Sequence, residues 1–337
     1  MTIALSVLDQ SVACSGRGQD HAIRDTVSLA AHCDALGYRR FWVSEHHGLP
    51  TIIGTAPEIL LAAISQATQR MRIGSAGVML PHYAAYKVAE QFRVLDALAP
   101  GRVDLGVGRA PGTDLRTAMR LNPAAVGAAD GFPEQVRDLI AWTRGQRHQG
   151  AVAHPLPPAD ASGFDRAPMV WMLGSSDYGA QLGAVLGLPY AFAYFFMDGQ
   201  GVEQALSLYR QLYRPSERHP RPQATICIWA LAADTEADAL HLAGSRERWR
   251  IDRQRGLLGP LQHPDEVAAR GFTTEELAYL QPMRAKSFVG TAAQVAAKIR
   301  QVAADLALDE IVINTWAHDP EVRRHSYALI AREIGTV

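Results

Sequence analysis

The chain has 337 residues, 48% of them hydrophobic and 20% charged, with a formal net charge of -1. This composition is typical of a globular protein with a large core, and the absence of a basic excess gives no indication of binding to nucleic acid or to an anionic membrane. No apolar run reaches the roughly 18 residues of a membrane span, and no basic leader precedes the first apolar run. The cysteines, Cys14, Cys33 and Cys227, form no CxxC pair, which predicts a reduced, cytoplasmic setting.

Short apolar runs alternate with amphipathic segments over the first 108 residues. The strand-like runs contain Ile3, Phe41, Ile73 and Val103, and the segments with helical spacing cover 20–36, 56–68 and 84–98. Gly37 follows the first helical segment directly, and Pro57 suits the first turn of the second. This order predicts β-then-α units and a parallel sheet.

The alternation resumes after a longer stretch. Further predicted strands contain Val170, Tyr190, Ile226 and Ile311, and further predicted helices cover 131–147, 177–186, 200–213, 291–306 and 321–334. Segments 109–168 and 234–285 exceed simple connections and are predicted as insertions, the second of them helical. Eight strand-helix units favour a single (β/α)8 TIM barrel over residues 1–337. An open doubly wound sheet is the alternative, but the first turn lacks the GxGxxG of a nucleotide-binding fold.

The second predicted strand ends in an unusual group of ionisable residues, Glu45, His46 and His47. A barrel places all its strand carboxyl ends at one mouth, so this group can belong to a catalytic site. Histidine titrates near neutral pH, which suits a general acid/base or a proton relay. Two alternatives stay open: imidazoles satisfied by hydrogen bonds, and a metal site. For a metal, successive strand residues point to opposite faces, so Glu45 and His47 can share a face but the two histidines need not converge.

Two other strand ends indicate a site for a flat or anionic ligand. The fourth strand ends in Gly108 and Arg109, where a glycine lets a ligand approach the backbone and the guanidinium can clamp a phosphate. The fifth ends in Gly174, Ser175 and Ser176 before a predicted helix, where free N–H groups and hydroxyls suit an anion. A plain turn and an ordinary helix cap are the respective alternatives.

An aromatic run, Tyr194-Phe195-Phe196, follows the sixth predicted strand. Bulky rings at the barrel mouth predict an apolar pocket for a flat or apolar ligand. The chain contains no GxSxG nucleophile elbow and no P-loop.

Several stretches together resemble bacterial luciferase and its relatives. They are 44–47, 74–81, 101–109 and 173–176, with 186–189 and the 288–291 start of the last helix, so the similarity covers essentially the whole chain. The resemblance implies one (β/α)8 barrel that binds reduced FMN at the strand carboxyl ends. It also implies a two-component monooxygenase, in which a separate flavin reductase supplies FMNH2 and the enzyme uses O2, and a homodimer.

The resemblance assigns roles to individual positions around the flavin ring. His46 corresponds to a histidine that lies beside the flavin and is important for catalysis. Ala76 and Gly77 correspond to a segment that passes close to the isoalloxazine ring, often through a non-proline cis peptide. Gly108 corresponds to a position near the reactive ring edge.

By the same resemblance, the positions of Arg109, Ser175 and Ser176 bind the phosphate. This chain also departs from luciferase itself, which carries cysteine at the position of Gly108 and a carboxylate at that of Ser175. Gly179 replaces a hydroxyl residue commonly used on the phosphate. These departures favour a non-luminescent relative.

The leading prediction is therefore an FMNH2- and O2-dependent monooxygenase that hydroxylates or epoxidises an apolar small molecule, as in the tailoring of secondary metabolites such as polyketides. One alternative is hydride transfer with a deazaflavin on the same barrel. A second, from another class, is a metal-dependent barrel hydrolase that uses Glu45 and His47. A third is a flavin-binding protein without turnover.

Overall fold

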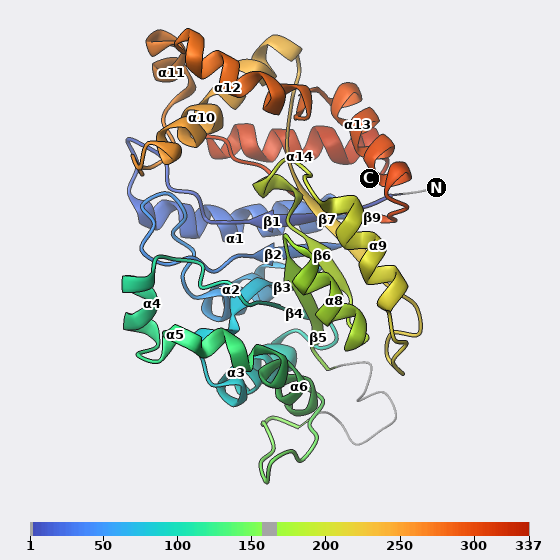
Figure 1. Cartoon of the computed structure of the whole chain (residues 1–337). Helices are drawn as coiled ribbons and strands as arrows, with labels where there is room; N and C mark the ends of the chain where they lie inside the picture. Colours follow the sequence, from blue (N-terminus) through green and yellow to red (C-terminus); the bar gives the residue numbers. More distant parts are fainter. Residues whose placement is uncertain (1–2, 157–166, 337) are drawn as a thin grey trace.

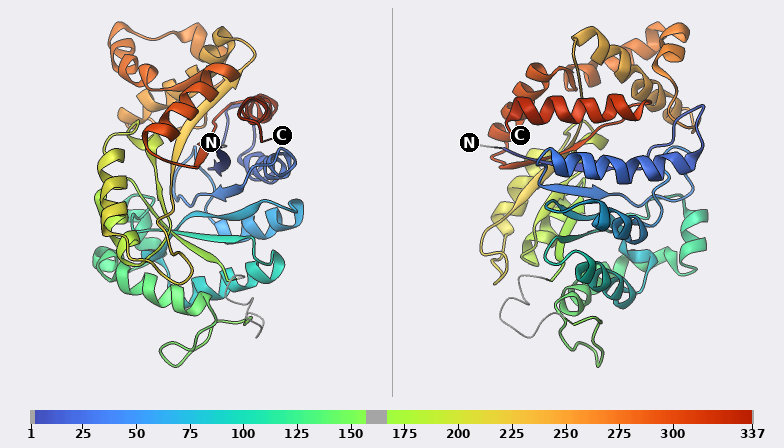
Figure 2. Two further views of the ribbon diagram at one scale, coloured as in Figure 1. Left: turned by 90° about the vertical axis from the view of Figure 1, so that its right-hand side faces the viewer. Right: turned by 180° about the vertical axis from the view of Figure 1, so that it is seen from behind.

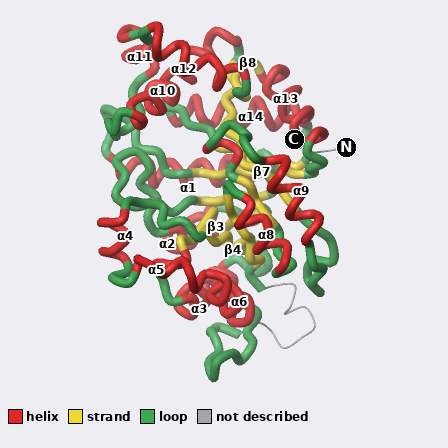
Figure 3. The backbone as a smooth tube through the Cα atoms, viewed as in Figure 1, coloured by secondary structure: helices red, strands yellow, loops and turns green. Residues whose placement is uncertain are grey.

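A parallel sheet occupies the middle of the computed structural model, which describes residues 3–156 and 167–336 (Figure 3). Its strands are β1 (Ala4–Asp9), β2 (Arg40–Val43), β3 (Arg72–Met79), β4 (Val103–Gly108), β5 (Met169–Gly174), β6 (Tyr190–Phe192), β7 (Ala224–Ala233), β8 (Phe288–Thr291) and β9 (Glu310–Asn314). The order is β6-β5-β4-β3-β2-β1-β9-β7-β8, and β6 also pairs with β7. This pairing closes the eight strands other than β8 into the predicted TIM barrel.

Strand β8 corrects the prediction, which placed 288–291 at the start of the last helix. Strand β7 is ten residues long, and its last four residues, 230–233, pair with β8 rather than with a barrel strand. Phe288 and Val289 are buried in this pairing. Thr291 ends β8 and at once caps the next helix, because its side chain accepts a hydrogen bond from the Gln294 N–H.

The helices lie around the barrel (Figure 1). They are α1 (Gln19–Ala35), α2 (Pro57–Ala67), α3 (Ala85–Leu98), α6 (Phe132–Thr143), α8 (Asp177–Val185), α9 (Val202–Leu212), α13 (Ala292–Asp305) and α14 (Pro320–Ile334). All eight were predicted, with end points within a few residues. Figure 2 shows α1 and α14, from opposite ends of the sequence, on the same side of the barrel, where they are in contact. None of the helices in the described ranges is long and apolar enough to cross a membrane.

The two predicted insertions carry further helices. In 109–168 the described part contains α4 (Leu115–Leu121) and α5 (Ala125–Ala128), and its residues 157–166 lie outside the described residues. In 234–285 lie α10 (Glu236–Gln254), α11 (Pro264–Arg270) and α12 (Thr274–Ala285), grouped at one end of the molecule (Figure 1). The division into a single domain over 1–337 stays a prediction.

The barrel interior is built in layers, because alternate residues of each strand point inward. A middle layer takes one residue from each of six strands: Leu8, Trp42, Trp171, Ala191, Cys227 and Val312. One layer nearer the strand amino ends, Arg40 binds Asp104 through Nη1 and Glu310 through Nε, each at 2.8 Å. Burial alone would raise the pKa of Asp104, but Arg40 and Arg72 outweigh it and hold this pKa below its usual value. The ionic layer fills the bottom of the barrel, and the cavity described below lies at the opposite end.

Strands β3 and β4 approach so closely at Gly106 that a side chain does not fit. A Cβ on Gly106 would collide with the backbone oxygen of Ser75, whereas a Cβ on Gly108 would lie at an ordinary 3.5 Å from the Met79 sulfur. We therefore expect Gly106→Ala to lower the free energy of unfolding by about 1–3 kcal/mol, and Gly108→Ala to change it much less. Urea denaturation of both variants measures this difference. Equal stability of the two would contradict the packing described here.

Candidate active site

A cavity opens at the carboxyl ends of the barrel strands, directly above the layer that contains Trp42. This inner cavity has a volume of about 1050 Å³, including the space at its mouth, and every barrel strand or the loop after it contributes to its wall. Eight of the ten predicted site residues line it: His46, Ala76, Gly77, Gly108, Arg109, Gly174, Ser175 and Ser176. The structure thus brings together the strand ends that the sequence singled out.

His46 is the ionisable group of the Glu45-His46-His47 triplet that faces this cavity. Its backbone N–H donates to the Gly54 oxygen at 3.0 Å, and its Nδ1 lies 3.2 Å from the Ser44 hydroxyl. Among the described residues, Nε2 has no hydrogen-bond partner. Burial lowers the pKa of His46 to about 4, against a weaker opposing effect of Glu45. The imidazole is therefore neutral at physiological pH, with one ring nitrogen held and the other available to a ligand.

This depressed pKa makes stability depend on pH. An unfolded histidine takes up a proton near pH 6.5, whereas folded His46 does so only near pH 4. Between these values the unfolded state binds more protons, so the free energy of unfolding should fall with falling pH, by on the order of 3 kcal/mol from this residue at most. We expect His46→Asn to reduce this slope in denaturation curves between pH 7 and pH 4. Part of the slope should remain in this variant, because burial also lowers the pKa of His219 to about 4. An unchanged slope in His46→Asn would contradict this explanation.

Glu45 and His47 lie outside the wall of the inner cavity and bind each other. The buried Glu45 carboxylate accepts from His47 Nε2 and from the Tyr83 hydroxyl at 2.7 Å each, and from the Met79 N–H at 3.0 Å. Burial and this hydrogen bond raise the pKa of Tyr83. The cluster ties the loop after β2 to the end of β3, which supports a positioning role. A catalytic role for Glu45 and His47 stays a prediction, and no group of three or more His, Cys, Asp or Glu side chains in the described ranges could hold a metal ion.

One wall of the cavity is made of backbone rather than side chains. A non-proline cis peptide joins Ala76 and Gly77, in the form that the luciferase resemblance suggests. A Cβ on Gly77 would collide with the Leu173 side chain and lie 2.8 Å from the Gly106 oxygen. Gly108 on the adjacent strand also lines the cavity without a side chain, so a planar ligand can approach the backbone here.

Several hydrogen-bond donors in the cavity lining have no partner in the part of the chain that the structure describes. Ser176 is the N-cap residue of α8, yet its side chain makes no capping hydrogen bond, so the predicted alternative of an ordinary cap is not realised. Among the described residues, the exposed hydroxyls of Ser175 and Ser176 have no partner. The Arg109 guanidinium lies 3.8 Å from the centre of the Tyr178 ring and forms no ion pair with a described carboxylate. Free hydroxyls, a helix amino end and a guanidinium are the donors that a phosphate requires.

A second, larger space continues from the first. This outer cleft, of about 2460 Å³ including open solvent, shares Gln10, His46, Ser175, Phe195 and Phe196 with the inner cavity. Its far wall comes from α10 and α12. His46 therefore stands where the two spaces meet, which is the place for a group that acts between two bound molecules.

Comparisons with known proteins identify the family of the chain. The family model of luciferase-like monooxygenases matches residues 1–310. A luciferase-like monooxygenase of Escherichia coli K12 is 37% identical over 328 residues, which cover 97% of this chain and 96% of that one. The chain belongs to the luciferase-like monooxygenase family. An N-acetyl-S-alkylcysteine monooxygenase of Bacillus subtilis is 32% identical over 336 residues, 98% of this chain and 97% of that one. Membership makes the chain an enzyme, a monooxygenase.

Solved structures of luciferase-like monooxygenases share the fold of this chain. That of apo-MsnO8 has a TM-score of 0.92 and 30% identity, and covers 99% of each chain. The oxygenating constituent of 3,6-diketocamphane monooxygenase from Pseudomonas putida, in complex with FMN, has a TM-score of 0.72 and 18% identity, covering 99% of this chain and 98% of that one. An F420-dependent secondary alcohol dehydrogenase has a TM-score of 0.64 and 15% identity, covering 99% of each. The last two share the fold.

In this luciferase-like monooxygenase, Gln10 lines the candidate site and was not among the residues predicted from the sequence. It lines both spaces, and its Oε1 accepts from Asn314 Nδ2 at 2.6 Å and from Trp316 Nε1 at 3.0 Å. Its amide nitrogen keeps no partner among the described residues. Asp9, one position earlier, points the other way and binds Arg323 at 2.8 Å. The alternation that starts with the inward-facing Leu8 is the signal that could have identified Gln10.

Proposed function

We propose that this luciferase-like monooxygenase binds reduced FMN in the inner cavity and uses O2 to insert one oxygen atom, by hydroxylation or epoxidation, into an organic molecule held in the outer cleft. The observation that carries the proposal is the inner cavity itself, whose lining combines Gly77, Gly108 and His46 with donors suited to a phosphate. A bound reduced flavin supplies the two electrons that O2 requires.

The residues of the cavity suit separate parts of this cofactor. Arg109, Ser175 and Ser176 would hold the phosphate, because none of the described residues accepts a hydrogen bond from their side chains. The Ala76-Gly77 segment would lie against the flat ring. FMN in the 3,6-diketocamphane monooxygenase structure favours this cofactor, while the F420-dependent relative keeps deazaflavin hydride transfer as the alternative.

The protein's own part in the chemistry is to position, to exclude water and to handle a proton. His46, held at Nδ1 by Ser44, would offer Nε2 as hydrogen-bond partner or acid/base at the junction of the two spaces. Phe195 and Phe196 line the same junction and would exclude water from it. We further propose that a separate reductase supplies the reduced FMN and that the enzyme is a homodimer, on the strength of the family resemblance.

Anaerobic titration separates the candidate cofactors. We expect reduced FMN to bind more tightly than reduced F420, and oxygenation with ¹⁸O2 to transfer one labelled atom to the product. Preferential binding of reduced F420 would favour hydride transfer instead.

Consumption of O2 with FMNH2 and no oxidised product from any substrate would favour a flavin-binding protein without turnover. Stoichiometric zinc or iron in the purified protein would favour the hydrolase.

A further inference from the structure

The wall of the outer cleft contributed by α10 and α12 is strongly cationic. The charged side chains that line the cleft are Arg246, Arg250, Arg253, Lys286 and one carboxylate, Asp198. Arg246, Arg250 and Arg253 are spaced i, i+4 and i+7 along α10, so they lie along one face of that helix. His46 is neutral, so the described lining has a net positive charge near neutral pH.

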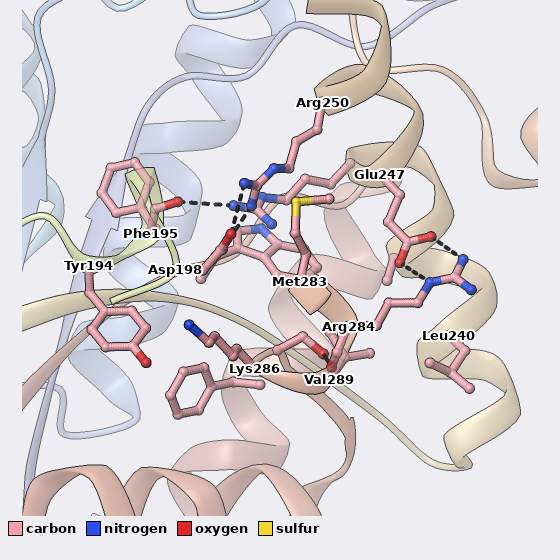
Figure 4. Close-up of a pocket in the computed structure, with 15 residues that line it drawn as sticks. Tyr194, Phe195, Asp198, Leu240, Glu247, Arg250, Met283, Arg284, Lys286 and Val289 are labelled. Atoms are coloured by element: carbon pink, nitrogen blue, oxygen red, sulfur yellow. Dashed lines mark hydrogen bonds and ion pairs between the residues drawn. The ribbon is translucent and has the colours of Figure 1, made fainter. Parts of the chain in front are cut away.

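The single carboxylate already has a partner. Asp198 binds the Arg250 guanidinium through both oxygens, Oδ1 to Nη1 at 2.8 Å and Oδ2 to Nη2 at 2.9 Å (Figure 4). Glu247, next to Arg246 in sequence, binds Arg284 with both oxygens and lines only the smaller adjoining pocket (Figure 4). Both carboxylates act on Arg246 electrostatically, but neither forms an ion pair with Arg246, Arg253 or Lys286, and no other carboxylate of the described residues does so.

Arg246 is the most informative of these cations. It is partly buried, its guanidinium lies 4.3 Å from the centre of the Trp229 ring, and its polar contact among the described residues is the Phe195 backbone oxygen at 3.5 Å. Burial and the nearby Arg250 lower its pKa to about 9, so it stays protonated at neutral pH. A partly buried cation beside another cation is unfavourable unless an anion joins it.

Buried arginines elsewhere in the described chain do not show this arrangement. Arg40, Arg93, Arg248 and Arg323 each form an ion pair with a carboxylate within 3.1 Å. The exposed cleft residues Arg253 and Lys286 also form no ion pair with a residue in the described ranges. Arg246, Arg253 and Lys286 thus differ from these four buried arginines, because none of the three forms an ion pair with a carboxylate of the described residues.

We propose that the outer cleft binds an organic anion, with Arg246 as the principal counterion of its carboxylate or sulfonate group. The apolar side chains of the cleft, among them Phe196, Trp249 and Trp316, would receive the body of the same molecule and extend it toward His46. The chemical class is therefore an amphiphilic acid, which refines the apolar substrate predicted from the sequence. Only the identification of this anion as the substrate rests on the proposed function.

Binding of four eight-carbon probes tests the proposal directly. Octanoate, octane-1-sulfonate, octanol and octylamine are titrated by calorimetry into the full chain, with and without saturating FMN. We expect both anions to bind at least about tenfold more tightly than octanol, octylamine to bind most weakly, and added salt to weaken only the anions. Octanoate and octane-1-sulfonate binding no better than octanol would overturn the proposal.

Substitutions then locate the anion. Arg246→Gln should weaken octanoate binding by about 10- to 100-fold and change octanol binding less than about threefold. Arg246→Lys should restore part of the loss, which a variant that merely misfolds would not do. Arg137→Gln on α6 removes the same charge from an exposed residue that lines neither space, and should leave both affinities unchanged. An octanoate-to-octanol ratio unaffected by Arg246→Gln would overturn the assignment.

Failure of the proposed function gives a different result. If the protein binds no reduced FMN but still prefers octanoate through Arg246, the anion site stands and the flavin proposal falls. If it binds reduced FMN and oxygenates a neutral substrate while Arg246→Gln leaves turnover and the probe affinities unchanged, the anion site falls and the flavin proposal stands.

Discussion

Replacing His46 by alanine should lower kcat by about 10²- to 10⁴-fold, the usual contribution of one positioned acid/base group. The imidazole lines both the inner cavity and the outer cleft, and its pKa of about 4 keeps it neutral over the working range. In the proposed reaction it acts between cofactor and substrate, so its removal affects turnover far more than binding. Stopped-flow oxidation of the reduced flavin complex, with product analysis, measures the loss.

His47→Ala is the matched control for this variant. His47 lies one position away, lines neither space and binds Glu45 at 2.7 Å, so its loss should act only through the positions of the loops. We expect FMN to bind His46→Ala with a dissociation constant within about threefold of the unsubstituted enzyme, since the phosphate-binding donors are untouched. Unchanged product formation in His46→Ala would remove His46 from the mechanism. A larger loss in His47→Ala would transfer the role to the Glu45-His47 pair.

Local patterns were sufficient to predict most of the fold. The eight barrel strands and the helices that follow them depend on short apolar runs and 3.6-residue spacing, which the sequence displays directly. Strand β8 was missed because it forms against the overhanging end of β7, and such a long-range pairing leaves no local signal. Phe288 and Val289 are too few to predict a strand by themselves.

Most of the residues predicted for the site line the cavity, but the sequence did not show which of Glu45, His46 and His47 face it. Glu45 and His47 do share a face, as the alternation allows, but it is the face away from the cavity. Trp42, Ser44 and His46 form the inward series, and knowing that Trp42 lies inside the barrel decides the matter. Arg246, Arg250 and Arg253 went unpredicted because charges on a helix are normally solvated. The position of α10 in the cleft wall depends on tertiary packing, which the local sequence does not display.

Replacing Arg109 by alanine should raise the dissociation constant of FMN by about 10- to 100-fold, the equivalent of one or two charge-assisted hydrogen bonds. The guanidinium lines the inner cavity, lies against Tyr178 and has no described carboxylate to neutralise it. A phosphate dianion at Ser175 and Ser176 would supply that charge. Fluorescence titration with FMN measures the change, and Arg116→Ala on the nearby α4, which lines neither space, is the charge-matched control.

Riboflavin, which has the same ring but no phosphate, shows whether the loss comes from the phosphate. If Arg109 binds the phosphate, Arg109→Ala should weaken FMN while leaving riboflavin nearly unchanged, so the preference for FMN over riboflavin should shrink by the same 10- to 100-fold factor, or about 1.4–2.7 kcal/mol. Ser175→Ala and Ser176→Ala should reduce this preference in the same direction, each by less, because a neutral hydroxyl contributes a weaker hydrogen bond. An equal loss for FMN and riboflavin would instead place Arg109 against the ring, and the phosphate would then need another partner, for which the cations of the outer cleft are the available group.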